Sequence, residues 1–260
     1  MLVHFTKLRG NELHAQDGVI GKVTDVYFDD HTWSARYFEV DCGQWLLSRK
    51  VLISPTAVHG PDWESDRLPV DLTKDQVRES PKVDTAQSLG RKEEEALHAH
   101  YAWAPYWGGA EFGGIGFGGG PGLSGGGAVP VAGARQDSAE TKAAAEASAR
   151  HEVNPHLRSM GEVKGYAIAA TDGSIGHVED FVVDDRDWSV RFVIVDTRNW
   201  LPGRKVAIAP AYLRSVDWAE GKVVVALTQK AIEESPAFDE SKPMAEGYSE
   251  QLGRHYGERG

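Results

Sequence analysis

The chain has 260 residues, a formal net charge of −11 and a single cysteine, Cys42. One cysteine excludes a disulfide within the chain and a thiolate metal site. The acidic balance argues against general binding to nucleic acid, because neutralising phosphates requires a basic face. The sequence contains no apolar run of membrane-spanning length and no signal-peptide pattern at its N-terminus, so we expect a cytoplasmic protein.

The sequence contains one long internal repeat. A shift of 155 positions aligns residues 17–81 with residues 172–236 without a gap, and about 27 of the 65 aligned positions are identical. A unit of this length is a duplicated small domain and is too long for a solenoid repeat. We predict one domain at residues 1–81 and a second at 156–236. A helical segment with a Gly/Ala-rich linker is predicted at 82–155, and a helical tail at 237–260.

In the first copy, short apolar-alternating runs predict strands. They lie at residues 35–40, 51–53 and 68–72. Asp29 and Asp30 are predicted to cap a tight turn, because Asp accepts hydrogen bonds from the nearby backbone. Five or six short strands in about 75 residues, without a helical pattern among them, favour a small closed antiparallel barrel or rolled sheet.

The segment after the first copy changes character. A short helix is predicted beyond Pro81, with a weak apolar stripe at Leu89, Leu97 and Tyr101. An aromatic stretch at residues 101–107 then leads into a Gly-dominated linker at 108–133, which spans roughly 28 Å as a coil. Residues 137–150 are rich in Ala and Glu and predict a marginal, solvated helix.

The second copy repeats the strand signals. Residues 190–195 are apolar on both faces, which predicts a strand buried on both sides. Gly221 is predicted to fold the segment that begins near Leu213 back onto residues 223–227 as a hairpin. After Pro236, four residues recur every fourth position and form one stripe of a helix. They are Met244, Tyr248, Leu252 and Tyr256.

Several motifs match catalytic or ligand-binding patterns but lack the other features that such sites require. Residues 114–119 match G-x-G-x-x-G, but the strand and helix of a dinucleotide site are missing around them. His98 and His100 lack the spacing of a helical metal pair and are predicted to be solvated. Cys42 aligns with Thr197 in the second copy, so a nucleophilic role would be confined to one copy. We therefore predict no catalytic, cofactor-binding or metal-binding residue.

The tryptophans divide into two groups. Six of the eight are repeated, as the pairs Trp33/Trp188, Trp45/Trp200 and Trp63/Trp218. Burial in a thin core is the favoured interpretation for most of them, because Trp covers a large apolar area. Trp45 and Trp200 lie beside polar residues and before an Arg-Lys pair, which is more typical of a surface that contacts a partner. The predicted partner-binding residues are Trp45, Trp200, Arg49, Arg204, Tyr248 and Leu252.

The repeated pattern resembles the PRC-barrel family. In each copy it reads L-x-G, D-G-x-x-G-x-V-x-D, D-D, W-x-x-R-x-x-x-V-D, W and R-K-V-x-I-x-P, within residues 8–81 and 163–236. The family includes the cytoplasmic barrel of the photosynthetic reaction-centre H subunit, the C-terminal domain of the ribosome maturation factor and free-standing bacterial proteins. The resemblance implies two all-β PRC-type barrels, each followed by a short helix and joined by the Gly-rich linker, without catalytic residues.

The resemblance favours a non-enzymatic module for protein binding or assembly. Its expected partners are another protein or a copy of itself, including pairing of the two barrels within one chain. The first alternative is a peripheral subunit of a membrane photosynthetic or electron-transfer complex. The second is an RNA or ribosome assembly factor. The H subunit's membrane-spanning helix and the ribosome factor's N-terminal domain have no counterpart in this sequence, which weakens both alternatives.

Overall fold

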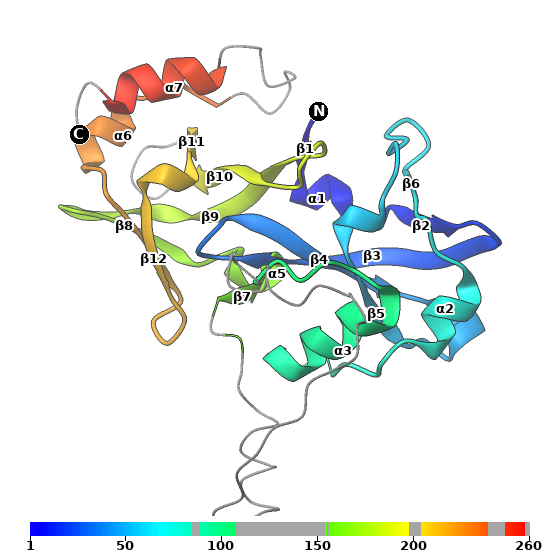
Figure 1. Cartoon of the computed structure of the whole chain (residues 1–260). Coiled ribbons are helices and arrows are strands. Elements are labelled where there is room, and N and C mark those ends of the chain that lie inside the picture. The colour runs from blue at the N-terminus through cyan, green and yellow to red at the C-terminus, as the bar shows by residue number, and fades with distance from the viewer. Residues whose placement is uncertain (85–88, 108–153, 155, 198–203, 239–247, 258–260) are drawn as a thin grey trace, which may run out of the picture. The chain divides into compact units, whose positions relative to one another are not determined.

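A computed structural model describes residues 1–84, 89–107, 154, 156–197, 204–238 and 248–257. It consists mainly of β-structure in two sheets, with few helices (Figure 1). The chain divides into two compact units. One unit contains residues 1–88 and 155–260, and therefore both copies of the repeat. The other contains residues 89–154, and the predicted linker at 108–133 and helix at 137–150 lie outside the described residues.

The two copies share one order of elements. The first contains β1 (Leu2–His4), α1 (Phe5–Leu8), β2 (Glu12–Ala15), β3 (Gly18–Asp29), β4 (Ser34–Asp41), η1 (Gly43–Leu46), β5 (Lys50–Ile53), η2 (Pro55–Ala57), β6 (Arg67–Pro69) and α2 (Lys74–Glu79). The second contains β7 (Leu157–Ser159), α5 (Met160–Val163), β8 (Ala167–Ala170), β9 (Gly173–Asp184), β10 (Val190–Asp196), β11 (Lys205–Ile208), η4 (Pro210–Tyr212), β12 (Leu213–Asp217), β13 (Lys222–Val225), α6 (Gln229–Glu233) and α7 (Tyr248–Gly257). The remaining unit contains α3 (Arg91–Tyr101).

The prediction of closed antiparallel barrels is wrong in two respects. The strands follow the open orders β5-β4-β3-β2-β6 and β11-β10-β9-β8-β13-β12, without hydrogen bonds that join the two ends in the described residues. In addition, β2 pairs with β6 and β8 pairs with β13 in parallel. These pairs join strands distant in sequence, so no tight hairpin forces them to be antiparallel. The predicted β12–β13 hairpin is confirmed, with Gly221 in the left-handed region at φ 57°.

Each copy also ends in a short helix, α2 or α6, which the alternating strand pattern did not predict. Thr73 caps α2 by accepting a hydrogen bond from the Gln76 N–H, and the Gln76 side chain accepts one from the Thr73 N–H. The Thr228 side chain caps α6 by accepting a hydrogen bond from the Ala231 N–H, without a reciprocal side-chain bond. The sequence Thr-x-x-Gln at residues 73–76 is a capping-box signal and could have revealed the first of these helices.

The repeated Ile-Gly pairs mark a close approach of two strands. A Cβ atom on Gly21 would lie 2.0 Å from the Asp41 carbonyl oxygen, and one on Gly176 would lie 2.0 Å from that of Asp196. Such a contact is sterically forbidden, so β3 can cross the end of β4, and β9 the end of β10, only where the side chain is absent.

The two copies exchange their first strands. β1 of the first copy pairs with β9 of the second, and β7 of the second copy pairs with β3 of the first (Figure 1). Asp180 binds the chain just after β1: its carboxylate accepts hydrogen bonds from the Thr6 N–H at 3.2 Å and the Thr6 hydroxyl at 2.7 Å. Asp25 does the same after β7, with the Ser159 hydroxyl at 2.6 Å and the Gly161 N–H at 3.0 Å. Each sheet is therefore completed by a strand from the other copy.

The centre of this exchange is a pair of symmetric main-chain contacts. Ser34 and Ser189, which occupy equivalent positions in the repeat, form an antiparallel bridge with each other. On either side, the Ala35 N–H donates to the Trp188 carbonyl at 2.8 Å, and the Val190 N–H donates to the Trp33 carbonyl at 2.7 Å. A pseudo-two-fold axis therefore passes between the two serines.

Both tryptophans at this axis have unusual backbones. Trp33 and Trp188 have φ values of 54° and 57°, in the left-handed region that bulky residues avoid. Their rings are buried, with Trp33 against Phe28 at 5.3 Å and Trp188 against Phe38 at 5.0 Å between ring centroids. The predicted burial of these two tryptophans is confirmed, and they lie where the copies meet.

Loss of the exchanged-strand contacts should destabilise the whole unit. We predict that Asp180→Ala lowers the free energy of unfolding by roughly 1–3 kcal/mol, because the Thr6 donors lose a buried charged acceptor. Asp25→Ala should have an effect of similar size. Urea denaturation followed by tryptophan fluorescence measures both, with Asp75→Ala as the control, since the Asp75 side chain is 70% exposed. An Asp180 effect as small as the control would contradict this role.

The exchange also predicts how the two halves of the chain behave. Residues 1–105 and 155–260, expressed separately, each lack a strand that the other supplies. We expect a mixture of the halves to form a one-to-one complex with a higher melting temperature than either half. Light scattering after size exclusion, with differential scanning calorimetry, tests this expectation. Two halves that each unfold cooperatively and do not associate would show that the exchange contributes little.

Candidate functional site

Of the predicted partner-binding residues, Trp45 lies in η1 and is half-buried. Its indole N–H donates to the Ile20 carbonyl, and the Lys74 ammonium lies 4.4 Å from the ring centroid. One face of the ring is thus covered by a cation of its own copy. Trp200 lies outside the described residues. Partner contact by either tryptophan stays a prediction.

Arg49 and Arg204 have an internal role. The Arg49 guanidinium donates to the carbonyls of Ser80 at 2.7 Å and Pro81 at 2.8 Å. It also donates to the Arg78 carbonyl at 3.1 Å, and the Arg204 guanidinium donates to the carbonyls of Glu233 and Ser235, which are equivalent to those of Arg78 and Ser80. The repeated arginines therefore hold the chain at the end of α2 and α6, where helix carbonyls lack partners within the helix.

The predicted stripe on α7 is covered by the second copy itself. Leu252 is buried, and the Tyr248 ring contacts Phe192 of β10 at 5.9 Å. Tyr256 is buried against Tyr212, with 5.0 Å between ring centroids. Met244 lies outside the described residues. Leu252 therefore has no surface left for an outside partner.

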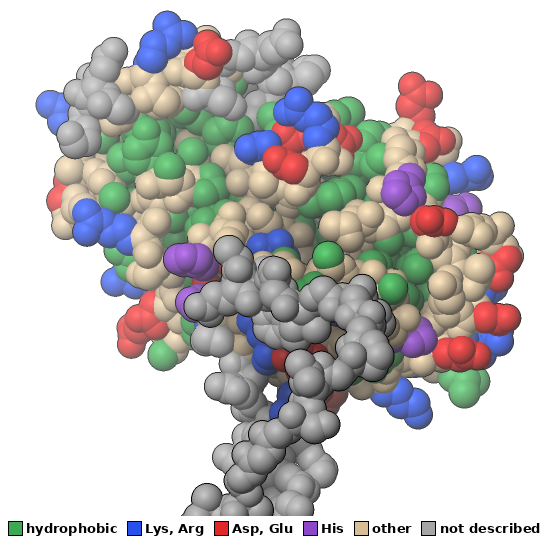
Figure 2. Space-filling view, in the orientation of Figure 1, with side chains coloured by type: hydrophobic (Ala, Val, Ile, Leu, Met, Phe, Trp, Pro, Cys, Tyr) green, Lys and Arg blue, Asp and Glu red, His purple; other side chains and the backbone are tan. Residues whose placement is uncertain are grey.

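A groove of about 990 Å³ lies where the first copy meets the second. Its walls are the turn after β3, the turn and first half of β10, and the segment from η4 into β12; α7 contributes Gly253. Figure 2 shows basic and acidic side chains gathered near the N-terminal strand, with exposed hydrophobic side chains beside them. Its lining residues include Trp33, Arg186, Arg191, Tyr212 and Arg214.

The charges in the groove are organised by one buried carboxylate. Asp184 is 1% exposed and accepts hydrogen bonds from the Arg186 guanidinium at 2.7 and 3.0 Å. Arg191 approaches the same carboxylate at 3.2 Å. The hydrogen bonds from Arg186 hold the pKa of Asp184 well below its usual range, so the carboxylate is ionised at neutral pH. Two arginines contact this carboxylate, although Arg191 also pairs with Asp187 at 2.7 Å, and the Arg186 side chain stays 78% exposed.

The third arginine, Arg214, is exposed on β12, the last strand in the order of its sheet. β12 pairs only with β13 among the described strands, and a register shift interrupts that pairing at Leu213 and Ser215. The groove therefore lies beside a strand edge that has a free row of main-chain donors and acceptors.

The sequence analysis did not identify this groove. Two of its three arginines are replaced at equivalent positions in the first copy, where His31 and His59 align with Arg186 and Arg214, whereas Arg191 aligns with Arg36. Such differences between two otherwise similar copies are the signal that could have drawn attention to it. The pairing of the copies brings Trp33 to the same groove. No difference between the aligned sequences indicates that pairing.

The residues 89–107 form a small cluster of their own, although they were predicted as helix and linker. The stripe Leu89, Leu97 and Tyr101, of which the last two lie on α3, is buried as predicted. The predicted solvation of His98 is wrong: it is 7% exposed, and its ring lies 4.5 Å from that of Trp107. The aromatic stretch folds back on α3 and covers it, which sequence spacing alone does not indicate.

Buried Glu94 anchors this cluster. Its carboxylate accepts hydrogen bonds from the Asn154 amide at 2.8 Å and from the Tyr106 hydroxyl, and it pairs with Arg91 at 3.0 Å. A buried charge is tolerated only with such partners. The Glu94 carboxylate is therefore enclosed by groups that satisfy its hydrogen-bonding capacity and charge.

Comparison with known families accounts for the first copy. Residues 2–77 match the family model of the PRC-barrel domain. The first repeat is a PRC-barrel domain. No curated protein matches the chain. The matched region begins with β1, the strand that the PRC-barrel domain gives to the second copy. Among the described residues, no helix has the length and apolar character needed to span a membrane.

The PRC-barrel domain contains the chain's one thiol, at the end of β4. Cys42 is 2% exposed. Burial raises the pKa of the Cys42 thiol to about 11; the cation of Arg49 opposes this change and the carboxylate of Asp41 adds to it. The thiolate is the reactive form, so burial suppresses both access and ionisation.

We predict that Cys42 reacts with a disulfide reagent such as DTNB at least ten times more slowly in the folded chain than in urea. The folded rate should rise with pH up to about 11, because only there does half of the thiol ionise. Absorbance at several pH values between 7 and 10 measures the rates. Rapid reaction at pH 7 in the folded chain would contradict the assignment of Cys42 as an inert core residue.

Proposed function

We propose that this protein is a non-enzymatic module in which two PRC-barrels, the second formed by residues 156–236, together bind an extended acidic segment of a partner protein. The binding site is the groove at the junction of the copies. The observation that carries the proposal is the composition of this groove: three arginines, two of them paired with aspartates, and the partly exposed ring of Tyr212 lie beside an open strand edge.

The open edge of β12 supports recognition of an extended segment. A peptide that adds to a sheet edge gains main-chain hydrogen bonds, and side-chain pockets beside the edge provide specificity. The partly exposed ring of Tyr212 provides apolar contact area in the same groove. Interfaces take much of their binding energy from such aromatic and arginine side chains.

The charges support an acidic partner. The chain as a whole has a net charge of −11, so a group of exposed arginines is a local exception. Asp184 pairs with Arg186 and Arg191, and Asp187 pairs with Arg191 as well, whereas Arg214 is exposed without a described acidic partner. The planar guanidinium of arginine can donate two parallel hydrogen bonds to one carboxylate, whereas the ammonium of lysine acts as a point charge. The same overall charge argues against RNA, whose phosphates would be repelled beyond the groove.

The proposal is tested with a displayed library of random peptides selected on the full chain. We expect enrichment of extended peptides with at least two Asp or Glu residues. A selected peptide, measured by fluorescence polarisation, should bind at least ten times more weakly to Arg214→Glu. Gly253→Trp should have the same effect, because a Cβ at Gly253 meets no atom within 4 Å and the larger ring would extend into the groove.

The matched control is Arg67→Glu, which makes the same charge change at an exposed position outside the groove. It should leave peptide affinity within about two-fold. A labelled single-stranded RNA serves as the competing ligand class and should not bind at physiological salt. The proposal fails if no enriched peptide depends on Arg214 and Gly253, or if RNA binds more tightly than the peptides.

A further inference from the structure

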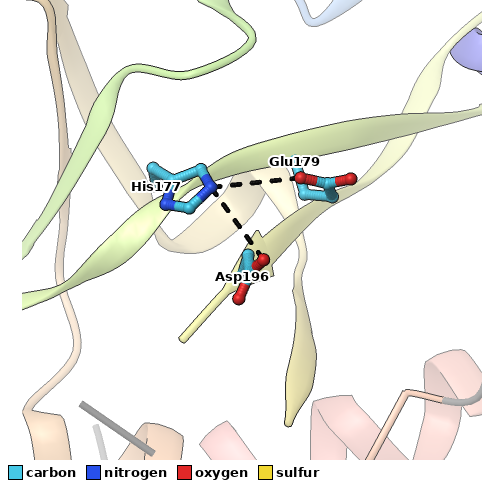
Figure 3. Close-up of side chains that lie close together, drawn as sticks. All are labelled: His177, Glu179 and Asp196. Atoms are coloured by element: carbon cyan, nitrogen blue, oxygen red, sulfur yellow. Dashed lines mark ion pairs between the residues drawn. The ribbon is translucent and has the colours of Figure 1, made fainter. Parts of the chain in front are cut away.

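A second cluster of ionisable side chains lies in the second copy, away from the groove. His177 and Glu179 are two residues apart on β9, and Asp196 ends the neighbouring strand β10 (Figure 3). The strand register places His177 directly opposite Asp196. Since alternate residues of a strand share one face, the three side chains converge on the same point of the sheet.

The geometry fits a small cation. The His177 Nε2 atom lies 4.0 Å from a carboxylate oxygen of Glu179 and 4.0 Å from one of Asp196. All three ligand atoms lie within 4.8 Å of one another. A point equidistant from them therefore lies no more than roughly 2.5 Å from each, whereas zinc–nitrogen and zinc–oxygen bonds are about 2.0–2.2 Å. Small side-chain rotations close that difference.

Burial places the cluster at the boundary between core and solvent. The Asp196 side chain is fully buried, whereas the side chains of His177 and Glu179 are 35% and 27% exposed. An ion would thus have a fixed carboxylate beneath it and an open side for water. The one described cation nearby is Lys205, 3.7 Å from the other oxygen of Glu179. Lys205 is partly exposed, and the strand register also places it opposite Asp196.

The first copy shows that the fold does not need these ligands. The positions of His177 and Glu179 are occupied there by Lys22 and Thr24, and only the aspartate is kept, as Asp41. The Thr24 hydroxyl instead donates to Glu39, and the Lys50 ammonium contacts the same carboxylate at 2.7 Å. One copy therefore carries an ordinary lysine–carboxylate cluster, and the other carries three potential metal ligands.

We propose that His177, Glu179 and Asp196 form a binding site for one divalent transition-metal ion, with Zn²⁺ as the reference ion. One imidazole and two carboxylates suit Zn²⁺ or Mn²⁺ better than Mg²⁺ or Ca²⁺, which prefer oxygen ligands alone. Three protein ligands leave at least one position for water. The bound ion would join β9 to β10 and stabilise the second copy, because it binds the folded chain and not the unfolded one.

The experiment titrates the metal-free full chain with ZnCl₂ by calorimetry and repeats the titration with MnCl₂ and MgCl₂. We expect one Zn²⁺ per chain, weaker Mn²⁺ binding, no measurable Mg²⁺ binding and a higher melting temperature with Zn²⁺. The double variant His177→Lys/Glu179→Thr has the side chains of the first copy, so it should fold while losing the stoichiometric site and the thermal shift.

A second variant, His98→Ala/His100→Ala, removes another histidine pair and should bind Zn²⁺ as the natural chain does. The metal proposal is overturned if the natural chain binds no Zn²⁺, or if His177→Lys/Glu179→Thr binds it equally well. If that variant does not fold, His177→Ala alone replaces it: an affinity for Zn²⁺ reduced at least ten-fold supports the site, and an unchanged affinity refutes it.

Discussion

Two main-chain hydrogen bonds between the copies, from Ala35 to Trp188 and from Val190 to Trp33, are the interaction on which the rest of this unit depends. They bring the turns of the two copies together, and each first strand can then reach the opposite sheet. Left-handed backbones at both tryptophans cost roughly 1–2 kcal/mol each. The strained backbone at each tryptophan directs its carbonyl toward the other copy, where the carbonyl accepts a hydrogen bond. Duplicated surfaces are self-complementary in this way when they pair about a two-fold axis.

The two copies differ in their side chains at the candidate sites and also around the exchanged strands. At the exchanged strands, Asp185 binds the terminal amine of Met1 and the indole N–H of Trp63, whereas Asp30 binds His156 and Arg158. Arg158 then lies over Trp218, 3.7 Å from the ring centroid. Trp63 of the first copy therefore contacts the second copy, whereas Trp218 of the second copy lies beneath Arg158 of its own copy. A duplicated domain needs only one copy to keep the original contacts, so the other is free to acquire new polar groups.

The sequence carried most of the information about local structure and little about the pairing. The 155-residue shift, the Gly221 hairpin and the doubly buried strand at residues 190–195 follow from spacing alone. The parallel pairs, the exchanged strands and the internal role of Arg49 do not, because they join residues far apart in the chain without a local signature. His177, Glu179 and Asp196 belong to this second class as well: strand register alone brings Asp196 to the other two.

Pairing and binding are thermodynamically coupled in this architecture. The first copy contributes Trp33 to the groove and the second contributes Arg186, Arg191 and Arg214, so a segment that contacts both sides binds only the paired form. Such a ligand stabilises the pairing by its own binding free energy, and the pairing in turn prepares the groove. A metal ion on β9 would act on the same equilibrium, since β9 is also the strand that receives β1. The joint between the copies is therefore the point at which any ligand of either site affects the whole unit.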